Sequence, residues 1–372
     1  MLTLLKNAEL FCPAPAGRGD VLLAGGVIAS VGPSLSAPDG FPVEVVECDG
    51  LRLIPGLVDC HAHLSGGGGE GGAHTRVPPM VADAFFQAGV TTAVGLLGTD
   101  ATTRALPELL AAARGLAHHG LTTWCYTGSY EVPVKTLTGS VRGDIVHVDR
   151  IVAAGEVAIS DHRSSQPTFD ELARIAADCH VSGLMTGKAG LLHLHLGDGE
   201  RGLSLVRRIL EETELPARTL HPTHLNRNPT LWQEAMNLAA SHGLYGDVTA
   251  FPQGDPCPSA ASCIAAWFER GLPEDRLTCS SDGGGCLPVF EDGELVDMDV
   301  GQPDTLLQTV RALVEAGIPL GQALRPVTDN PARLFRFHGK GRLAQGADAD
   351  VVVLDENCRP TQVFVGGRRV LG

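Results

Sequence analysis

Two histidines, His61 and His63, follow directly on an apolar run near the start of the sequence. Side chains of an extended strand alternate between its two faces, so both imidazoles are expected to point the same way. Two imidazoles on one face can hold one divalent metal ion. The glycines at 66–69 let the backbone pass close to a bound group. Taken alone, the pair fits a hydrogen-bonded surface strand as well as a metal site.

Apolar runs of strand length recur along the chain, and helix-length segments separate them. The expected strands are residues 53–58, 90–97, 122–128, 156–161, 191–196, 218–224, 245–250 and 276–281. Helices are expected at 81–89, 104–120, 169–179 and 201–213. Eight strands that alternate with helices predict an α/β fold, a (β/α)8 TIM-like barrel, whose chemistry takes place at the carboxyl ends of the strands. A doubly wound parallel sheet is the alternative.

Ligand-type side chains stand at the ends of several of these strands. They are His61 and His63 at the end of the first strand, Glu156 at the start of the fourth, His195 and His224 at the ends of the fifth and sixth, and Asp282 just after the eighth. Histidine nitrogens and carboxylate oxygens suit zinc and similar divalent metals. Because strand ends converge on one rim of a barrel, the set predicts a metal centre there. His193 lies one layer deeper than His195, so we expect a hydrogen-bonded core histidine.

The two ends of the chain follow a different pattern, in which short apolar runs alternate with turns. Turn signals stand at Gly25-Gly26, at Pro38-Asp39-Gly40 and at Gly366-Gly367. Residues 1–52 and 341–372 are therefore expected to form β-hairpins. This predicts a small β-sandwich domain built from both chain termini, beside a barrel domain of residues 53–340.

The composition argues against several classes of function. The 372 residues are 44% hydrophobic and 19% charged, which suits a large buried core. A net charge of −15 and a pI near 5.3 argue against nucleic acid or an anionic membrane as a partner. The sequence has no apolar run of transmembrane length and no signal-peptide pattern. Ten cysteines without CxxC pairs suit free thiols in a reducing compartment, so a cytoplasmic location is expected.

The chain resembles the amidohydrolase superfamily and, within it, the isoaspartyl (β-aspartyl) dipeptidases. The blocks that carry the resemblance are PGLVDCHAHLSGGGGEGG (55–72), GLLGTD (95–100), TGSYEVP (127–133), ISDHRS (159–164), HLGD (195–198), PTHLNRN (222–228), SSDGGG (280–285) and ADADVVVLD (347–355). They run in family order over nearly the whole chain. The HxH pair and the lone aspartate identify the superfamily, whereas the GGGGE, DHR and THxNRN blocks are narrower signals.

The resemblance implies two divalent metal ions, expected to be zinc. One ion would be held by His61, His63 and Asp282, and the other by His195 and His224. The bridging ligand of the family is normally a carboxylated lysine, but here Glu156 occupies that position and Lys188 lies far outside the motif. We expect Glu156 to bridge both ions directly. The alternative is a solvated glutamate at a strand start and a second ion that is weak or absent.

The resemblance also implies hydrolysis of the β-aspartyl amide of a dipeptide by a metal-bridging hydroxide. Asp282 would shuttle the proton, and Tyr130 would donate to the oxyanion, although a buried aromatic that caps a loop is the alternative role for Tyr130. The substrate-binding residues implied are Arg163 and Arg227 for the two carboxylates, Glu70 for the α-ammonium, and Thr99, the backbone near Gly68 and Cys286 for further hydrogen bonds. Cys286 departs from the family, which has a serine there, and a thiol is the weaker donor.

Two rival functions remain open from the sequence. One is another amidohydrolase activity, such as an N-acyl amino-acid deacylase or a cyclic amidase. The other is a metal-free barrel that acts as a binding or scaffold protein, for which the departure at Glu156 is the supporting feature. The family further implies a homo-oligomer, and the expected partner is a small dipeptide.

Overall fold

The computed structural model describes residues 2–251, 257–291 and 294–372. Eight parallel strands form a barrel: β6 (Leu57–Ala62), β7 (Val90–Gly95), β8 (Thr122–Thr127), β9 (Ile151–Ile159), β10 (Leu192–Leu196), β11 (Leu220–Thr223), β12 (Gly246–Thr249) and β13 (Leu277–Ser280). Strands β6 to β11 pair in chain order, and β12 pairs with β13. Strand β12 also lies beside β11, and β13 beside β6. This confirms the predicted (β/α)8 barrel.

The barrel closes where the chain after β13 meets the end of β6. A parallel bridge joins Ala62 to Gly283, and the backbone N–H of His63 donates to the carbonyl of Gly283 at 2.7 Å. One layer below, the backbone N–H of Ser281 donates to the carboxylate of Asp59 at 3.2 Å. These contacts bring the first and last barrel strands, which are far apart in the sequence, into one continuous rim.

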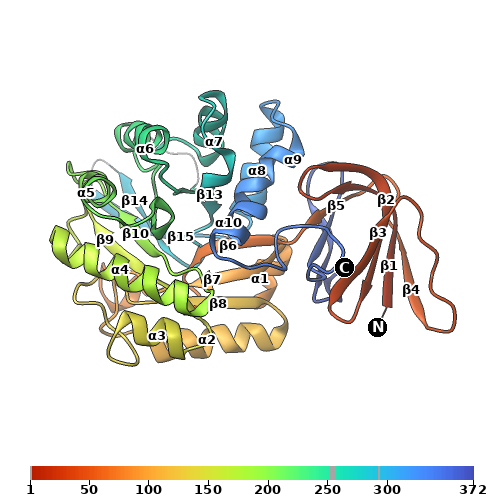
Figure 1. The fold of residues 1–372 in the computed structure, drawn as a ribbon, viewed down its shortest axis with the longest axis horizontal. Coiled ribbons are helices and arrows are strands. Elements are labelled where there is room, and N and C mark those ends of the chain that lie inside the picture. Colours follow the sequence, from red (N-terminus) through yellow and green to blue (C-terminus); the bar gives the residue numbers. More distant parts are fainter. Residues whose placement is uncertain (1, 252–256, 292–293) are drawn as a thin grey trace.

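Helices surround the barrel, as Figure 1 shows. They are α1 (Ala82–Gln87), α2 (Leu106–His119), α3 (Val141–His147), α4 (Phe169–Thr186), α5 (Ser204–Glu212), α6 (Pro229–His242), α7 (Ala260–Glu269), α8 (Thr305–Glu315), α9 (Leu320–Ala323) and α10 (Asp329–Leu334), with short 3-10 turns at Ala73–Thr75, Ala217–Thr219, Glu274–Arg276 and Arg325–Val327. Helix α4 begins with a reciprocal cap between Thr168 and Glu171. Helix α6 begins after Asn228, whose side chain accepts from the Leu231 N–H at 2.9 Å.

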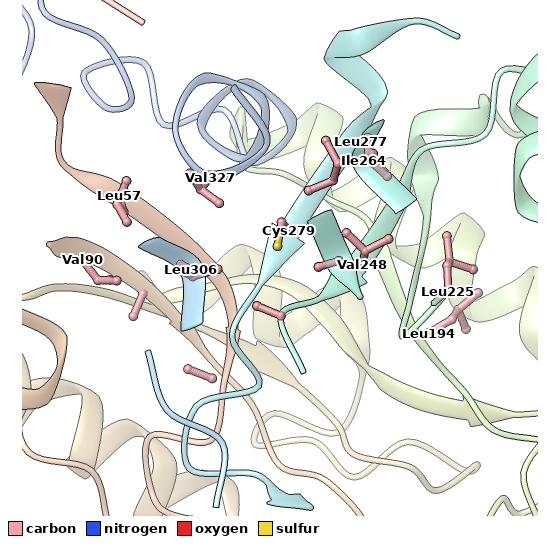
Figure 2. Packing of buried hydrophobic residues seen from close by; sticks show 14 of the residues in the cluster. Leu57, Val90, Leu194, Leu225, Val248, Ile264, Leu277, Cys279, Leu306 and Val327 are labelled. Atoms are coloured by element: carbon pink, nitrogen blue, oxygen red, sulfur yellow. The ribbon is translucent and has the colours of Figure 1, made fainter. Parts of the chain in front are cut away.

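The core of the barrel domain lies where the strands pack against these helices. Leu57, Val90, Leu194, Val248 and Leu277 are buried members of this cluster and come from five different strands (Figure 2). Burial of such side chains stabilises a fold by about 1.5–3 kcal/mol each. A rigid scaffold of this kind holds the strand ends in fixed positions.

The small domain joins strands from both ends of the chain into one sheet. Its strands are β1 (Leu2–Phe11), β2 (Pro15–Ala24), β3 (Val27–Gly32), β4 (Val43–Glu47), β5 (Arg52–Pro55), β16 (Val351–Leu354), β17 (Pro360–Val365) and β18 (Arg368–Leu371). The order is β18-β17-β16-β5-β1-β2-β3, and β4 pairs with β1. Both termini lie in this domain beside the barrel (Figure 1). The strands expected at the two termini are therefore confirmed.

Two predicted strands differ from the structure by more than their end residues. The single strand expected at 53–58 is two strands, because β5 ends at Pro55 in the small sheet and β6 begins at Leu57 in the barrel. Gly56 separates them, and a Cβ there would lie 2.2 Å from the hydroxyl of Thr91, so only glycine fits. The strand expected to begin at Glu156 begins at Ile151. Its small residues at 153–155 have low strand propensity, but pairing with β8 and β10 overrides that preference.

Two further features complete the fold. A hairpin of β14 (Cys286–Glu291) and β15 (Glu294–Val300) follows the barrel's last strand. All ten cysteines are free thiols, as predicted. Within the described part of the chain, every helix is too short or too polar to cross a membrane.

Candidate active site

The structure brings together all six predicted metal ligands at the carboxyl end of the barrel. Their ligand atoms form overlapping groups of three whose members all lie within 4.8 Å of one another. We call this set the metal-facing layer: His61 on β6, His63 just after it, Glu156 on β9, His195 on β10, His224 just after β11 and Asp282 just after β13. All six are buried. Histidines and carboxylates from five strands thus converge on one place.

Glu156 lies between two pairs of histidines. Its Oε1 is 3.7 Å from the Nε2 atoms of both His61 and His63. Its Oε2 is 3.1 Å from Nδ1 of His195 and 3.5 Å from Nε2 of His224. The sequence alternative of a solvated glutamate at a strand start is wrong, because Glu156 lies inside β9 and is 1% exposed. Each oxygen of the carboxylate therefore faces one pair of imidazoles.

Several buried polar atoms of this layer have no hydrogen-bond partner within the part of the chain that the structure describes. They are Nε2 of His61, Nδ1 of His63 and Oδ1 of Asp282. Oδ1 of Asp282 lies 3.3 Å from Nε2 of His61 and 3.1 Å from Nε2 of His63, without hydrogen-bond geometry. Buried polar atoms are normally hydrogen-bonded, so such exceptions need a ligand. Nitrogen and carboxylate donors that converge in this way fit a divalent metal such as zinc.

Charges in the layer are strongly coupled. Burial alone would lower the pKa of His61, but the carboxylates of Glu156 and Asp282 raise it to about 9. Burial would raise the pKa of both carboxyl groups, but the histidines facing them hold the pKa of Glu156 and of Asp282 well below the ordinary range. Both carboxylates are therefore ionised at neutral pH and are available as ligands.

Two of the predicted metal ligands have an unusual backbone conformation. His224 has a φ of 58° and Asp282 a φ of 53°, in the left-handed region that residues other than glycine rarely adopt. Such conformations persist only where the surrounding structure enforces them, and they gather at functional sites. At both positions the strand has just ended and the side chain turns into the barrel mouth.

Beneath the metal-facing layer lies a second set of polar side chains, which we call the lower layer: His193, His221, Thr278 and Asp247. His193 is fully buried, and its two ring nitrogens contact His61 at 2.8 Å and His221 at 3.0 Å. The prediction of a hydrogen-bonded core histidine is thus confirmed. Burial, together with the neighbouring imidazoles, lowers the pKa of His193 well below its ordinary value. Burial likewise lowers the pKa of His221 to about 4.

Lys188 lies away from this site, as expected. Its ammonium group donates to three backbone carbonyls, those of Ile145, Val148 and Ile151, at 2.6–2.9 Å. Because these bonds hold the amine at the end of α3 and the start of β9, Lys188 cannot act as a bridging ligand.

Asp161 is a site residue to which the sequence analysis assigned no role. Its Oδ2 lies 3.0 Å from Nε2 of His195 and accepts from Nη2 of Arg163 at 2.8 Å. A carboxylate on the far nitrogen of a metal-binding histidine orients the ring. Burial would raise the pKa of Asp161, but the hydrogen bonds from His195 and Arg163 lower it. Its position in the DHR block, two residues before Arg163, was the sequence signal that could have identified it.

Tyr130 lies over His195, with its hydroxyl 2.7 Å from Nδ1 of that ring. The side chain is 6% exposed. Burial, followed by the charge of Glu156, raises the pKa of Tyr130 well above 10, so the phenol keeps its proton. It is thus a fixed hydrogen-bond donor at the edge of the metal-facing layer. The guanidinium of Arg163 stacks 5.4 Å from the centre of its ring.

The predicted charged substrate ligands line the mouth of the site. Arg163 uses one edge of its guanidinium for Asp161, while Nη1 lies 3.7 Å from Oε1 of Glu70. Nη1 of Arg227 lies 3.7 Å from Oδ2 of Asp198. The side chains of Arg163, Glu70 and Arg227 are 21–25% exposed. Both signs of charge are thus present beside the metal-facing layer and within reach of solvent.

The three uncharged residues predicted to bind substrate are Thr99, Gly68 and Cys286. The hydroxyl of Thr99 is buried and has no partner in the described residues. Gly68 has a φ of 73°, and a Cβ there would lie 2.4 Å from the carbonyl of Thr75 and 3.4 Å from Sγ of Cys286. Burial raises the pKa of Cys286 to about 11, so its thiol is neutral at pH 7. Cys286 is therefore a weak donor close to the glycine run.

Comparison with known proteins agrees with this geometry. The pattern of the Amidohydrolase family matches residues 52–370. The fold is similar to that of β-aspartyl dipeptidase from Fervidobacterium islandicum AW-1 in complex with β-Asp-Leu, with a TM-score of 0.93 and 42% identity, covering 100% of this chain and 97% of that one. Dihydroorotase from Anaplasma phagocytophilum is 25% identical over an alignment that covers 94% of this chain and 85% of that enzyme.

Another relative matches over a shorter stretch. Imidazolonepropionase from Acidiphilium cryptum is 34% identical over 140 residues, and the alignment spans 36% of this chain and only 34% of that enzyme. The family pattern, in contrast, covers the barrel and most of the small domain's C-terminal strands. On this evidence the chain belongs to the amidohydrolase family, and it is similar to the family's β-aspartyl dipeptidases.

Proposed function

We propose that this protein is a metal-dependent hydrolase that cleaves the β-aspartyl amide bond of dipeptides. The observation that carries the proposal is Glu156, whose two oxygens each face one pair of histidines. It would bridge two divalent ions, which we propose to be zinc. The likeness to β-aspartyl dipeptidases, at 40–42% identity over the whole chain, supports the choice of substrate.

The residues of the metal-facing layer would divide between the two ions. His61, His63 and Asp282 would hold one, and His195 and His224 the other. When bound, the ions supply Lewis acidity, which lowers the pKa of a water molecule and polarises an amide carbonyl. The orphaned nitrogen of His61 and the orphaned oxygen of Asp282 support this assignment.

Two side chains would carry the proton and the developing charge. Asp282 is ionised because the facing histidines lower its pKa, so it can accept the proton of the attacking water and pass it to the leaving amine. Tyr130 keeps its phenolic proton and can donate to the oxyanion that forms on the attacked carbonyl. Asp282 lies beside His61 and His63, and Tyr130 lies beside His195.

The charges at the mouth suit a zwitterionic dipeptide. A β-aspartyl dipeptide carries two α-carboxylates and one α-ammonium group. Arg163 and Arg227 would bind the carboxylates, because a guanidinium fork matches a carboxylate. Glu70 would bind the ammonium group, and it now lies opposite Arg163 at 3.7 Å. Thr99, the Gly68 backbone and Cys286 would supply the remaining hydrogen bonds.

The proposal is tested by elemental analysis of the purified protein and an assay of the same sample with β-Asp-Leu, using α-Asp-Leu for comparison. About two metal ions per chain and turnover of the β-linked peptide alone are expected. Two ions without turnover would redirect the substrate to another amide. One ion or none would show that Glu156 does not bridge. We also propose a cytoplasmic location and a homo-oligomer, and size-exclusion chromatography of this sample tests the oligomeric state.

A further inference from the structure

A continuous chain of hydrogen bonds runs from the metal-facing layer into the lower layer. Nδ1 of His61 meets Nε2 of His193 at 2.8 Å, and Nδ1 of His193 meets Nδ1 of His221 at 3.0 Å. Nε2 of His221 meets the Thr278 hydroxyl at 2.9 Å, and that hydroxyl donates to Oδ1 of Asp247 at 2.5 Å. All five side chains are at most 2% exposed. The chain therefore links a metal ligand to a buried carboxylate.

The carboxylate of Asp247, at the lower end of this series of hydrogen bonds, determines which atom donates and which accepts in each of them. Asp247 accepts the hydroxyls of Thr223 and Ser280 on Oδ2, and that of Thr278 on Oδ1. Because Thr278 donates its only proton to Asp247, its oxygen must accept from Nε2–H of His221. A neutral imidazole has one N–H and one lone pair. His221 therefore presents the lone pair of Nδ1 to the next ring.

The same rule continues upward through the two remaining rings. The lone pair of His221 accepts from Nδ1–H of His193, so the lone pair of His193 is on Nε2. That lone pair accepts from Nδ1–H of His61. When His61 is neutral, its own lone pair is then on Nε2, the buried atom that has no partner within the described residues and faces Glu156 and Asp282.

We propose that His193, His221, Thr278 and Asp247 are positioning residues that hold His61 in its Nδ1–H tautomer, with Nε2 ready to bind metal. The inference rests on the metal site of the proposed function and deepens it. Two other histidines of the layer have simpler partners, since His195 meets Asp161 and Nδ1 of His224 meets Thr249 at 2.7 Å. Only for His61 among these three ligands does the choice of tautomer pass through two further imidazoles.

Packing holds the middle ring of the chain in place. The ring of Tyr126 stacks on His193 at 4.9 Å with an interplanar angle of 16°. The Tyr126 hydroxyl is not part of the chain, because it donates to the carbonyl of Cys60 at 2.7 Å. Tyr126→Phe therefore removes one buried hydrogen bond of the same layer but leaves the stack and the chain intact. It is the matched control for substitutions at His193.

The test compares His193→Phe with His193→Gln. Phenylalanine keeps the stack but removes both hydrogen bonds, whereas glutamine can accept from His61 and donate to His221. Loss of an outer partner of a metal-binding histidine weakens metal binding by about 10- to 100-fold. We expect His193→Phe to weaken zinc binding by this factor in competition with a chelator. We expect His193→Gln to recover most of it, and Tyr126→Phe to bind zinc like the unaltered protein.

Two readouts distinguish a positioning role of these hydrogen-bonded residues from a purely structural role. Thermal unfolding of the metal-free variants reports stability, and the visible spectrum of the cobalt-loaded variants reports the ligand field. A destabilised His193→Phe protein with unaltered zinc affinity and cobalt spectrum would overturn the positioning chain alone. Absence of metal uptake by the unaltered protein would instead overturn the proposed metal site.

The unaltered protein offers a direct check that needs no variant to fold. In zinc-loaded protein with 15N-labelled histidine, nuclear magnetic resonance identifies which ring nitrogen carries the proton. We expect the proton on Nδ1 of His193 and on Nε2 of His221. A proton on Nε2 of His193 would reverse the chain and overturn the inference.

Discussion

The barrel interior contains two histidine-rich layers, one above the other, and they differ in what their polar atoms face. In the metal-facing layer, Nε2 of His61 and Oδ1 of Asp282 are buried without hydrogen-bond partners in the described residues. In the lower layer, both ring nitrogens of His193 and of His221 have partners at 2.8–3.0 Å. Both layers contain buried histidines. The difference teaches that unused lone pairs, rather than buried histidines as such, mark the site that needs a ligand.

Glu156→Gln should have the largest effect on the metal-facing layer, because it removes the charge that faces both histidine pairs. An amide cannot supply two anionic oxygens, so we expect loss of detectable turnover and metal binding that is more than about 100-fold weaker, beyond the effect of an outer partner. Metal content and the β-Asp-Leu assay measure both. The control is Glu131→Gln, an exposed glutamate paired with Lys135. Normal metal content in Glu156→Gln would refute the bridging role.

Tyr130→Phe tests whether the metal-facing layer extends to an oxyanion donor. Loss of one such donor costs about 3–4 kcal/mol in the transition state, a drop of about 10²–10³-fold in kcat with KM little changed. Because burial raises the pKa of Tyr130 well above 10, the rate of the unaltered enzyme should not fall through ionisation of this phenol between pH 7 and 10. A lower melting temperature with unaltered kcat would indicate instead that Tyr130 only caps its loop.

Removal of metal should make the two layers respond differently to pH. In the metal-free protein the carboxylates raise the pKa of His61 to about 9, above its unfolded value of about 6.5. The resulting stability is present below pH 6.5 and is lost as the pH rises through 9, a change of up to about 3 kcal/mol. His193 and His221 have lowered pKa values and stay neutral in this window.

Denaturant unfolding of chelator-treated protein between pH 6 and 10 measures this loss. Metal-loaded protein is the reference, since a bound ion keeps His61 unprotonated. A flat stability profile for the metal-free protein would contradict the charge coupling between His61 and the two carboxylates.

Glu70→Gln tests the charges at the mouth above the metal-facing layer. A hydrogen bond to a charged group contributes about 1.5–3 kcal/mol, so kcat/KM for β-Asp-Leu should fall about 10- to 100-fold. The control is a substrate rather than a variant. N-acetyl-β-Asp-Leu lacks the α-ammonium group, and the substitution should not slow its cleavage further. An equal loss for both substrates would indicate that Glu70 acts through its ion pair with Arg163 and does not bind the ammonium group.

Cys286→Ser is expected to have the smallest effect. A hydroxyl is a better donor than the neutral thiol, and the gain of about 0.5–1.5 kcal/mol should lower KM for β-Asp-Leu by about two- to tenfold. Steady-state kinetics measure it, with kcat as the internal control because the thiol lies outside the metal-facing layer. A raised KM for β-Asp-Leu would mean that the substrate binds better beside the thiol than beside a hydroxyl.

The metal-facing layer could be predicted from sequence because barrel geometry makes strand ends converge. His195 and Asp282 needed only a correct strand count to be placed on one rim. The bounds of individual strands were harder to predict from the sequence, since Glu156 lies inside a strand whose alanines and glycine have weak strand propensity. The break at Gly56 depends on contact with Thr91, which local sequence does not encode.

The lower layer could not be predicted as a connected chain. His193 and His221 face each other only because β10 and β11 pair in that register, and His61 reaches His193 across the barrel. Register and cross-barrel distance are set by tertiary packing and have no sequence signal within one strand. Asp161 was missed for a related reason, because its contact with His195 depends on how the loop after β9 folds back.

The insertion of β5 between β1 and β16 has a consequence for synthesis of the protein. Leu53 pairs with Val353, and the whole barrel is encoded between them. At about 5–20 residues per second, roughly 15–60 s of translation separates the two strands. During this interval the growing chain exposes an unpaired strand edge that leads directly into the strand carrying His61. The edge of β5 that pairs with β16 therefore stays open until Val351–Leu354 has been synthesised.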